Sequence, residues 1–369
     1  MNKYTKNDFY KRFCTEEFDE NGVLSKFTPK VEENYNFAFD VISELAKDEP
    51  EKRALMWCNE NGEERTFTFS QLDKQSNKVA NMFKANGINK GDHVMLVLRR
   101  NYQFWFSVLA LNKIGAIAIP ATDQLMKKDY VYRFQAASIT AVICTSFGQS
   151  KEHIEQAQKE YDGLKCKFLV GDCSQNYNGW IDFNHQAEKY NDTIERYDTH
   201  WSDPMLLYFT SGTTGYPKMV RHDNTYSIGH IITAKEWQCV DPDGIHLTIS
   251  DTGWGKAAWG KLYGQWIMRT TVFVYDFDRF NAANMLEMMS KNKITSFCAP
   301  PTMFRFFIKE GIENYDLSSL KNVAIAGEAL NPEVFNKFKE YTGLKLMEGF
   351  GQTETTMLIG NLRGTEPKP

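Results

Sequence analysis

Residues 210–218 carry side chains suited to binding phosphate. They are Thr210, Ser211, Gly212, Thr213, Thr214, Gly215, Tyr216, Pro217 and Lys218. Glycines permit positive φ and close backbone approach, while hydroxyl and backbone N–H groups donate hydrogen bonds to phosphate oxygens. Lys218 adds a positive charge, and Pro217 stiffens the chain before it. Because the apolar run 205–209 precedes these residues and predicts a buried strand, we expect a phosphate-binding loop at a strand end.

This run is not the phosphate loop of mononucleotide kinases. That motif, G-x-x-x-x-G-K-[ST], would need glycine where Pro217 stands and a hydroxyl where Met219 stands. A polar turn without a ligand is the plain alternative. Four hydroxyls, two glycines and a lysine in nine residues favour the phosphate loop over such a turn.

Two later segments, A-G-E-A-L at 326–330 and E-G-F-G-Q-T-E-T at 348–355, accompany the loop in the same order as in a known family. Together the three segments resemble the signature of the AMP-forming adenylating superfamily, which includes acyl-CoA synthetases, luciferases and the adenylation domains of peptide synthetases. Weaker matches at 66–69 and 90–92 extend the resemblance over nearly the whole chain.

The resemblance implies a role for each motif residue. The loop 210–218 would hold the β- and γ-phosphates of ATP, and Phe350 would lie against the adenine. Thr353 would contact the α-phosphate, Glu354 would hold Mg²⁺, and both would act with Lys218 in catalysis. The other residues expected to bind the nucleotide are Gly327, Glu328, Ala329, Glu348, Gly349, Gly351 and Gln352.

The implied chemistry fits these residue types. A carboxylate is a poor electrophile, so it is first converted to an acyl adenylate, which brings two anions together. Mg²⁺, Lys218 and oriented N–H groups would reduce the repulsion, and losing one such donor typically costs about 3 to 4 kcal/mol. Coenzyme A would then take the acyl group as a thioester.

Two segments narrow the range of carboxylic acids expected as substrate. Residues 250–256 and 297–302 look most like medium-chain acyl-CoA synthetases, with acetyl-CoA synthetases as near relatives. Acetate-specific members carry tryptophan directly before Gln-Thr-Glu, whereas this chain has Gly351. We therefore expect a short-to-medium-chain carboxylate, with Trp254 as one pocket wall or, alternatively, as a core tryptophan.

Two other functions stay open. Residues 253–258 fit G-x-G-x-x-A, and Asp276 stands where a ribose-binding acid would follow, so an NAD(P)-dependent oxidoreductase is one alternative. A bulky tryptophan inside the turn and its late position in the chain argue against it. The other alternative is a non-catalytic protein that keeps the AMP-binding fold.

Alternating apolar runs and amphipathic stretches predict an α/β fold with two packed, parallel-type sheets flanked by helices. We expect a first lobe over 1–200 and a second over 201–369, joined by a connector at 174–204. Predicted strands are 94–98, 116–119, 141–144, 167–170, 206–209, 245–249, 271–275, 294–298 and 323–326. Ser70 with Asp73 predicts one helix start, and Asn331 before Pro332 predicts another.

The composition limits the classes of partner and the cellular locations that can be expected. A net charge of −4 gives no global positive field for nucleic acid or an anionic membrane, so small molecules are favoured; oligomer formation stays open. No secretory leader or long apolar run is present, which predicts a cytoplasmic protein. The seven cysteines read as reduced thiols, and the scattered histidines predict no metal site built from protein alone.

The end of the chain carries a further expectation. The family continues past Gln-Thr-Glu into a ribose-binding aspartate, a hinge and a small C-terminal domain with a catalytic lysine. Residues 357–369 contain no aspartate and are too short for a domain. The sequence thus predicts a large-domain fragment that is inactive alone.

Overall fold

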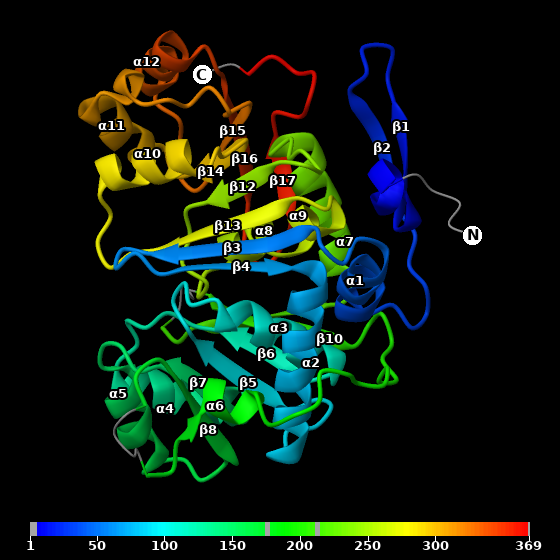
Figure 1. Ribbon diagram of the computed structural model, residues 1–369, viewed down its shortest axis with the longest axis vertical. Helices are drawn as coiled ribbons and strands as arrows, with labels where there is room; N and C mark the ends of the chain where they lie inside the picture. The colour runs from blue at the N-terminus through cyan, green and yellow to red at the C-terminus, as the bar shows by residue number, and fades with distance from the viewer. Residues whose placement is uncertain (1–5, 174–177, 211–214, 368–369) are drawn as a thin grey trace.

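The computed structural model describes residues 6–173, 178–210 and 215–367. Two large sheets dominate it, one above the other in Figure 1. The order in the lower sheet is β11 (Lys218–Asp223), β10 (Pro204–Thr210), β6 (Ile117–Pro120), β5 (His93–Val97), β7 (Ile139–Thr145), β8 (Cys166–Val170) and β9 (Ile181–Asp182). Its strands run parallel except the edge strand β11, which pairs antiparallel with β10.

The upper sheet has eight strands. Their order is β17 (Met357–Gly360), β16 (Leu346–Gly351), β15 (Asn322–Ile325), β14 (Ser296–Ala299), β12 (Ile245–Thr248), β13 (Thr271–Asp276), β3 (Arg53–Asn59) and β4 (Glu64–Thr68). Only the edge strands β17 and β4 pair antiparallel. A separate hairpin is formed by β1 (Cys14–Phe18) and β2 (Leu24–Pro29).

Helices cover both faces of each sheet, as the alternating pattern predicts. The α-helices are α1 (Glu44–Asp48), α2 (Phe69–Ala85), α3 (Gln103–Lys113), α4 (Lys127–Ala136), α5 (Ser150–Gln158), α6 (Phe183–Ala187), α7 (Tyr226–Ile231), α8 (Gly255–Gly260), α9 (Tyr263–Ile267), α10 (Ala282–Lys291), α11 (Pro301–Glu310) and α12 (Pro332–Thr342). Shorter 3-10 and π turns are η1 (Lys6–Arg12), η2 (Ala38–Ser43), η3 (Ile232–Trp237) and η4 (Ile312–Asn314).

Strand alternation divides the apolar side chains among three cores. Along β5, Val94 and Leu96 join the core between the sheets, while Met95 and Val97 pack under α4 and α5. Along β13, Val272 joins the shared core and Phe273 packs under α10 to α12. Because both faces of each sheet are covered, these strands read as continuous apolar runs. Each fully buried aliphatic side chain contributes about 1.5 to 3 kcal/mol.

The predicted α/β class and all nine predicted strands are confirmed, with end shifts of a few residues. The predicted division at residue 200 does not separate the sheets. Strands β10 and β11 follow it but belong to the lower sheet, whereas β3 and β4 precede it and belong to the upper sheet. The apolar run 205–209 lies inside the lower sheet because β10 pairs with β6, where Leu206 lies opposite Ala118.

Two local predictions need correction. The described part of the connector is not a simple link between lobes, because β9 and α6 pack on β8 at the edge of the lower sheet. The start of α2 is capped by Thr68 and Gln71 rather than by Ser70 and Asp73. Thr68 Oγ1 accepts from Gln71 N at 3.3 Å, and Gln71 Oε1 accepts from Thr68 N at 3.0 Å. Asn331 caps α12 as predicted, accepting from Glu333 N at 2.8 Å.

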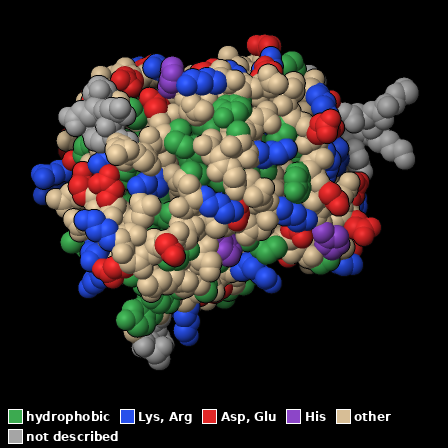
Figure 2. Space-filling model, turned by 90° about the horizontal axis from the view of Figure 1, so that it is seen from below, with side chains coloured by type: hydrophobic (Ala, Val, Ile, Leu, Met, Phe, Trp, Pro, Cys, Tyr) green, Lys and Arg blue, Asp and Glu red, His purple; other side chains and the backbone are tan. Residues whose placement is uncertain are grey.

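The surface carries charges of both signs. Figure 2 shows Lys and Arg mixed with Asp and Glu over the face seen from below, so no field of one sign covers that face. Within the described ranges, no helix combines the length and apolar character needed to cross a bilayer. All seven cysteines are free, five of them buried.

Candidate active site

A cavity of about 580 Å³ lies where β12, β15 and β16 end. Ligands of open α/β sheets usually bind at the carboxyl ends of parallel strands. The lining residues are Trp254, Gly255, Lys256, Trp259, Ala326, Gly327, Glu328, Ala329, Glu348, Gly349, Phe350, Gly351, Gln352 and Thr353. The structure thus brings two of the three predicted motifs into one cavity, together with the segment at 254–259.

The segment after β15 turns sharply into the cavity. Gly327 has φ of 109°, a conformation that favours glycine, and nothing lies within 4 Å of where its Cβ would be. Glu328 is exposed and accepts a 2.5 Å hydrogen bond from Thr302 Oγ1 at the start of α11. The backbone at Gly327 therefore leaves room beside it for a flat ligand.

Strand β16 is fitted between two indoles. A Cβ on Gly349 would lie 2.4 Å from Cε2 of Trp237, and one on Gly351 would lie 2.1 Å from Cη2 of Trp259. Glycine is therefore required at both positions unless an indole moves. Phe350, between them, is 55% exposed and lines the cavity. An aromatic ring left this open is suited to stacking on a ligand.

Trp259 bears on the predicted acyl pocket. The space that a side chain at 351 would enter is occupied by the Trp259 ring. Trp254 is 62% exposed and lines the cavity, so it is not a packed core tryptophan. Gly351 therefore makes room for the Trp259 ring, and both residues line the cavity at this point.

The turn after β16 is tied to the lower sheet. The Thr353 carbonyl lies 2.7 Å from His222 Nε2 of β11. Because a carbonyl only accepts, Nε2 carries the proton. Burial lowers the pKa of His222 despite the opposing effect of this hydrogen bond, and the ring stacks on Tyr226 at 3.8 Å. Glu354 is exposed and does not line the cavity.

The phosphate-loop prediction falls partly outside the described residues, which omit Ser211, Gly212, Thr213 and Thr214. Thr210 ends β10 and lies opposite Lys218, the first residue of β11. Gly215 has φ of 118°, as expected of a loop glycine. Tyr216 stacks on Tyr132 at 4.6 Å. Lys218 is exposed, and the described loop residues do not line the cavity.

Sequence reasoning missed the roles of Lys256, Trp259 and His222. Lys256 Nζ donates to Ala326 O at 2.9 Å, and burial lowers the pKa of this amine. The sequence did contain a signal for Lys256, because it lies inside the apolar run G-W-G-K-A-A-W-G at 253–260. A lysine in such a run is unusual for a buried helix. The contacts of Trp259 and His222 depend on packing between distant segments and have no local signal.

Over the described ranges, no three His, Cys, Asp or Glu side chains are close enough to hold an ion. His230, for example, is fully buried against aromatic rings, and burial lowers its pKa to about 3.

Solved structures share this fold. A crystal structure of a Brucella canis acyl-CoA synthetase has a TM-score of 0.82 and 24% identity, covering 91% of this chain and 60% of that one. The anthranilate CoA ligase AuaEII, solved with anthranoyl-AMP, has a TM-score of 0.84 and 24% identity, covering 91% and 64%. At this identity the likeness concerns the fold alone.

Curated relatives are closer in sequence. Human acyl-coenzyme A synthetase ACSM3, mitochondrial, is 34% identical over 346 residues, which are 92% of this chain and 58% of the relative. ACSM5, mitochondrial, of Rattus norvegicus is 36% identical over 345 residues, with 92% and 59% covered. The chain spans less than two thirds of the length of either relative.

These names overturn the predicted location. The relatives are mitochondrial proteins, so the prediction of a cytoplasmic protein is wrong. It relied on the lack of an apolar leader, which tests for secretion; mitochondrial targeting segments are amphipathic and need no apolar core. The AMP-binding enzyme family matches residues 42–369, and with relatives above 30% identity the chain belongs to that family.

Proposed function

We propose that the protein is an AMP-forming acyl-CoA synthetase. The carboxylate oxygen attacks the α-phosphorus of ATP and pyrophosphate leaves. The thiol of coenzyme A then attacks the acyl carbon, and AMP leaves with the electron pair of the broken C–O bond. The observation that carries this proposal is the single cavity lined by 326–329, 348–353 and 254–259.

The adenine is assigned to the part of the cavity between Phe350 and the 327–329 turn. Phe350 offers an exposed ring, and Gly327 leaves the facing space open. Thr353 follows directly and would reach the α-phosphate, with its backbone held by His222. Positioning of this kind supplies much of the rate enhancement when two anions must meet.

The phosphate loop is assigned to the β- and γ-phosphates. Thr210 and Lys218 face each other at the ends of β10 and β11, so Thr210 Oγ1 and Lys218 Nζ start from adjacent strands. Tyr132 supports the loop from α4, since its hydroxyl donates to Pro217 O at 2.8 Å. A loop fixed at this point would present preorganised donors to the leaving group.

Mg²⁺ fits this assignment. Glu354 is exposed beside Thr353, and Mg²⁺ is commonly held by one or two carboxylates together with substrate phosphates and water. When bound, the ion offsets phosphate charge. Glu354 would hold it, while the other donors would come from ATP and water.

The acyl group is assigned to the region between Trp254 and Gly351. Trp259 limits that region, so short-to-medium acids are favoured over long ones. Lys256, a cation whose pKa burial lowers, lines the cavity near Glu328. Each methylene changes the discrimination by only about 1 to 3 kcal/mol, so a range of acids is expected.

The oxidoreductase alternative is not favoured. Asp276, which would have to bind a ribose, instead accepts from Asn101 at 3.0 Å and pairs with Arg100. Trp254 occupies the turn that should approach a pyrophosphate closely, and its ring faces the cavity.

Pyrophosphate exchange into ATP tests the proposal directly. The full-length protein is assayed with straight-chain acids of increasing length, branched acids, benzoate and amino acids. We expect exchange with short-to-medium acids and a decline for longer ones. Exchange with acetate alone, or with an amino acid alone, would contradict the assignment of the acyl pocket, and no exchange with any acid would contradict the function.

A further inference from the structure

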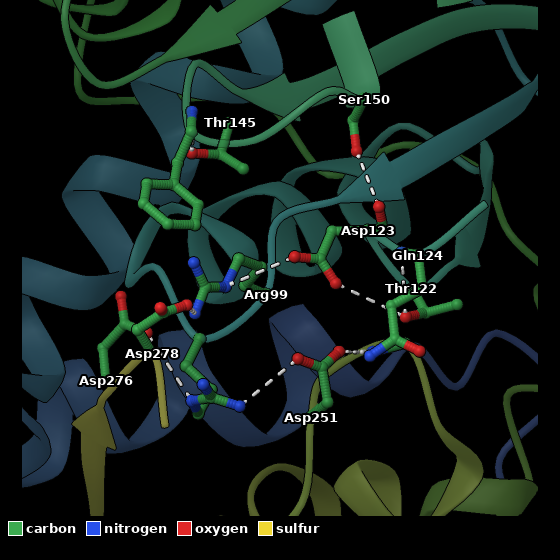
Figure 3. A network of polar contacts seen from close by, with 12 residues as sticks. Arg99, Thr122, Asp123, Gln124, Thr145, Ser150, Asp251, Asp276 and Asp278 are labelled. Carbon is green, nitrogen blue, oxygen red and sulfur yellow. Dashed lines mark hydrogen bonds and ion pairs between the residues drawn. The ribbon is translucent and has the colours of Figure 1, made fainter. Parts of the chain in front are cut away.

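A group of charged side chains lies where the two sheets meet, outside the cavity (Figure 3). We call it the charge junction. Its members are Arg99, Arg100, Asp123, Asp251, Asp276 and Asp278. They end or follow β5, β6, β12 and β13, so both sheets contribute. The mechanism proposed above uses none of them.

Arg100 is held in a single orientation. Its NH1 lies 3.4 Å from Asp251 Oδ2, and its Nε lies 3.5 Å from Asp276 Oδ1. Its NH2 donates to the Phe277 carbonyl, and the guanidinium lies 4.3 Å over the Phe277 ring. Only 12% of the side chain is exposed. A planar guanidinium can serve these partners at once, whereas an ammonium cannot.

Asp251 connects Arg100 to a turn. Its second oxygen, Oδ1, accepts from Gly253 N at 2.9 Å. One carboxylate therefore joins an arginine after β5 in the lower sheet to the backbone after β12 in the upper sheet. Figure 3 shows dashed lines at both carboxylate oxygens of Asp251.

Two further contacts fix the same turn. Thr252 is fully buried, and its hydroxyl donates to the Arg99 carbonyl. A Cβ on Gly253 would lie 2.5 Å from Ala121 C and Thr122 N, so the turn touches the chain after β6 and has no space for a side chain. The turn 251–254 is thus located by the lower sheet, although it belongs to the upper one.

This turn leads directly into the cavity wall. It ends on Trp254, and α8 begins at the next residue and carries Lys256 and Trp259. All three line the cavity. We infer that Arg100 is a positioning residue for acyl selection: through Asp251 it holds the turn 251–254, and so sets where Trp254 stands. The inference rests on the proposed function for its catalytic consequence.

The structural half is tested without catalysis. The chain is labelled with 5-fluorotryptophan, and the Trp254 signal is assigned in ¹⁹F NMR spectra by its loss in Trp254→Phe. We expect Arg100→Lys and Asp251→Asn each to shift or broaden this signal, and the double variant to add little to either. Arg65→Lys is the control, because Arg65 is exposed and its side chain donates to the neighbouring Glu64 carbonyl, outside the junction.

The Trp57 signal is not diagnostic, because its Nε1 donates to the Arg100 carbonyl. An unmoved Trp254 signal in folded Arg100→Lys would overturn the inference. Should Arg100→Lys fail to fold, Asp251→Asn decides alone, since it keeps the shape of the side chain: a moved signal supports the inference and an unmoved one overturns it.

The catalytic half uses pyrophosphate exchange by the full-length protein. We expect Arg100→Lys to raise KM for the preferred acid about tenfold, while KM for ATP changes less than twofold. A moved Trp254 signal with unchanged KM values would overturn the role in selection. If the unmodified protein shows no exchange at all, the proposed function fails, and the NMR arm still decides whether Arg100 positions the turn.

Discussion

The cavity and the charge junction both lie at the carboxyl ends of parallel strands, but they differ in the exposure of their side chains. In the cavity, Trp254 and Phe350 are 62% and 55% exposed, and the space beside Gly327 is open. In the junction, Arg99 and Arg100 are only 11% and 12% exposed, and each pairs with two carboxylates.

The difference in exposure indicates that the carboxyl ends of the strands serve two purposes, ligand binding and stabilisation of the fold. Exposed rings and an open turn are not packed against other parts of the chain, so they are free to pack against a ligand. Paired, buried charges already have partners within the chain, and removing one partner leaves the other charge buried and unpaired. We therefore expect changes in the ligand region to reduce binding or catalysis directly. Changes in the junction should reduce stability, and those at Arg100 should also weaken binding of the acid through the turn 251–254.

The largest effect is expected from Lys218→Met on the ligand side. If Lys218 stabilises the charge of the leaving pyrophosphate, its loss should lower the exchange rate of the full-length protein about 100- to 1000-fold. Stability should change little, because Lys218 is exposed. Lys128→Met, at another exposed position, is the control. A rate within tenfold of the unmodified protein would remove Lys218 from the mechanism.

The next effect concerns pH and two buried histidines. Burial lowers the pKa of both His230 and His246 to about 3, below the usual 6.5. The unfolded chain therefore binds more protons than the folded chain below pH 6.5, and stability falls as the pH falls. Each histidine should cost about 1.4 kcal/mol of unfolding free energy between pH 7.5 and 5.5.

Urea unfolding at the two pH values measures this loss. His246, which contacts Ser296 Oγ and Thr248 Oγ1 at 2.8 Å, is replaced by glutamine. The variant should lose about 1.4 kcal/mol less than the unmodified chain over the same interval. His185→Gln is the control, since His185 is exposed. Equal losses in all three proteins would refute the expectation.

An effect smaller than the combined loss from the two histidines is expected in the junction. Arg99→Met removes the partner of Asp123 and Asp278 and the contact over Phe147, and should lower the unfolding free energy by about 2 kcal/mol. The figure is modest because Asp278 is half exposed. Binding of an acyl-adenylate analogue by the folded variant should stay within twofold. Arg65→Met is the control, and a loss no larger than in that variant would break the comparison.

The smallest effect is expected from Phe350→Ala. Stability should change by less than about 0.5 kcal/mol, because the ring is more than half exposed. The affinity for an acyl-adenylate analogue should fall about tenfold as the stacking surface is lost. Phe306→Ala provides a matched control at an exposed ring outside the cavity. Equal affinities of the two variants would exclude Phe350 from the adenine site.

Sequence patterns predicted the parts of the fold that depend on local chemistry. Strands such as β5 and β13 were found because burial on both faces makes them continuous apolar runs. Strands β4 and β17 were not, because they are edge strands with mostly exposed or half-buried residues. The assignment of β3 to the upper sheet and β10 to the lower one depends on pairing between distant segments, which no local pattern records.

The residues of the site can likewise be divided into those that the sequence predicts and those that it does not. The motifs at 326–330 and 348–355 could be recognised from residue types and order, and residues 326–329 and 348–353 meet in the cavity. The contact of Trp259 with Gly351 and the bond from His222 to Thr353 could not, because each joins residues far apart in the chain. Arg100 and Asp251 are ordinary charged residues in sequence, and only their burial at the junction gives them a role.

A crystal structure of the chain bound to a non-hydrolysable acyl sulfamoyl adenosine tests the central claim most directly. We predict that the adenine lies between Phe350 and the 327–329 turn, with the acyl group toward Trp254 and Gly351. An analogue bound elsewhere, or saturating analogue that leaves this cavity without density, would contradict the account.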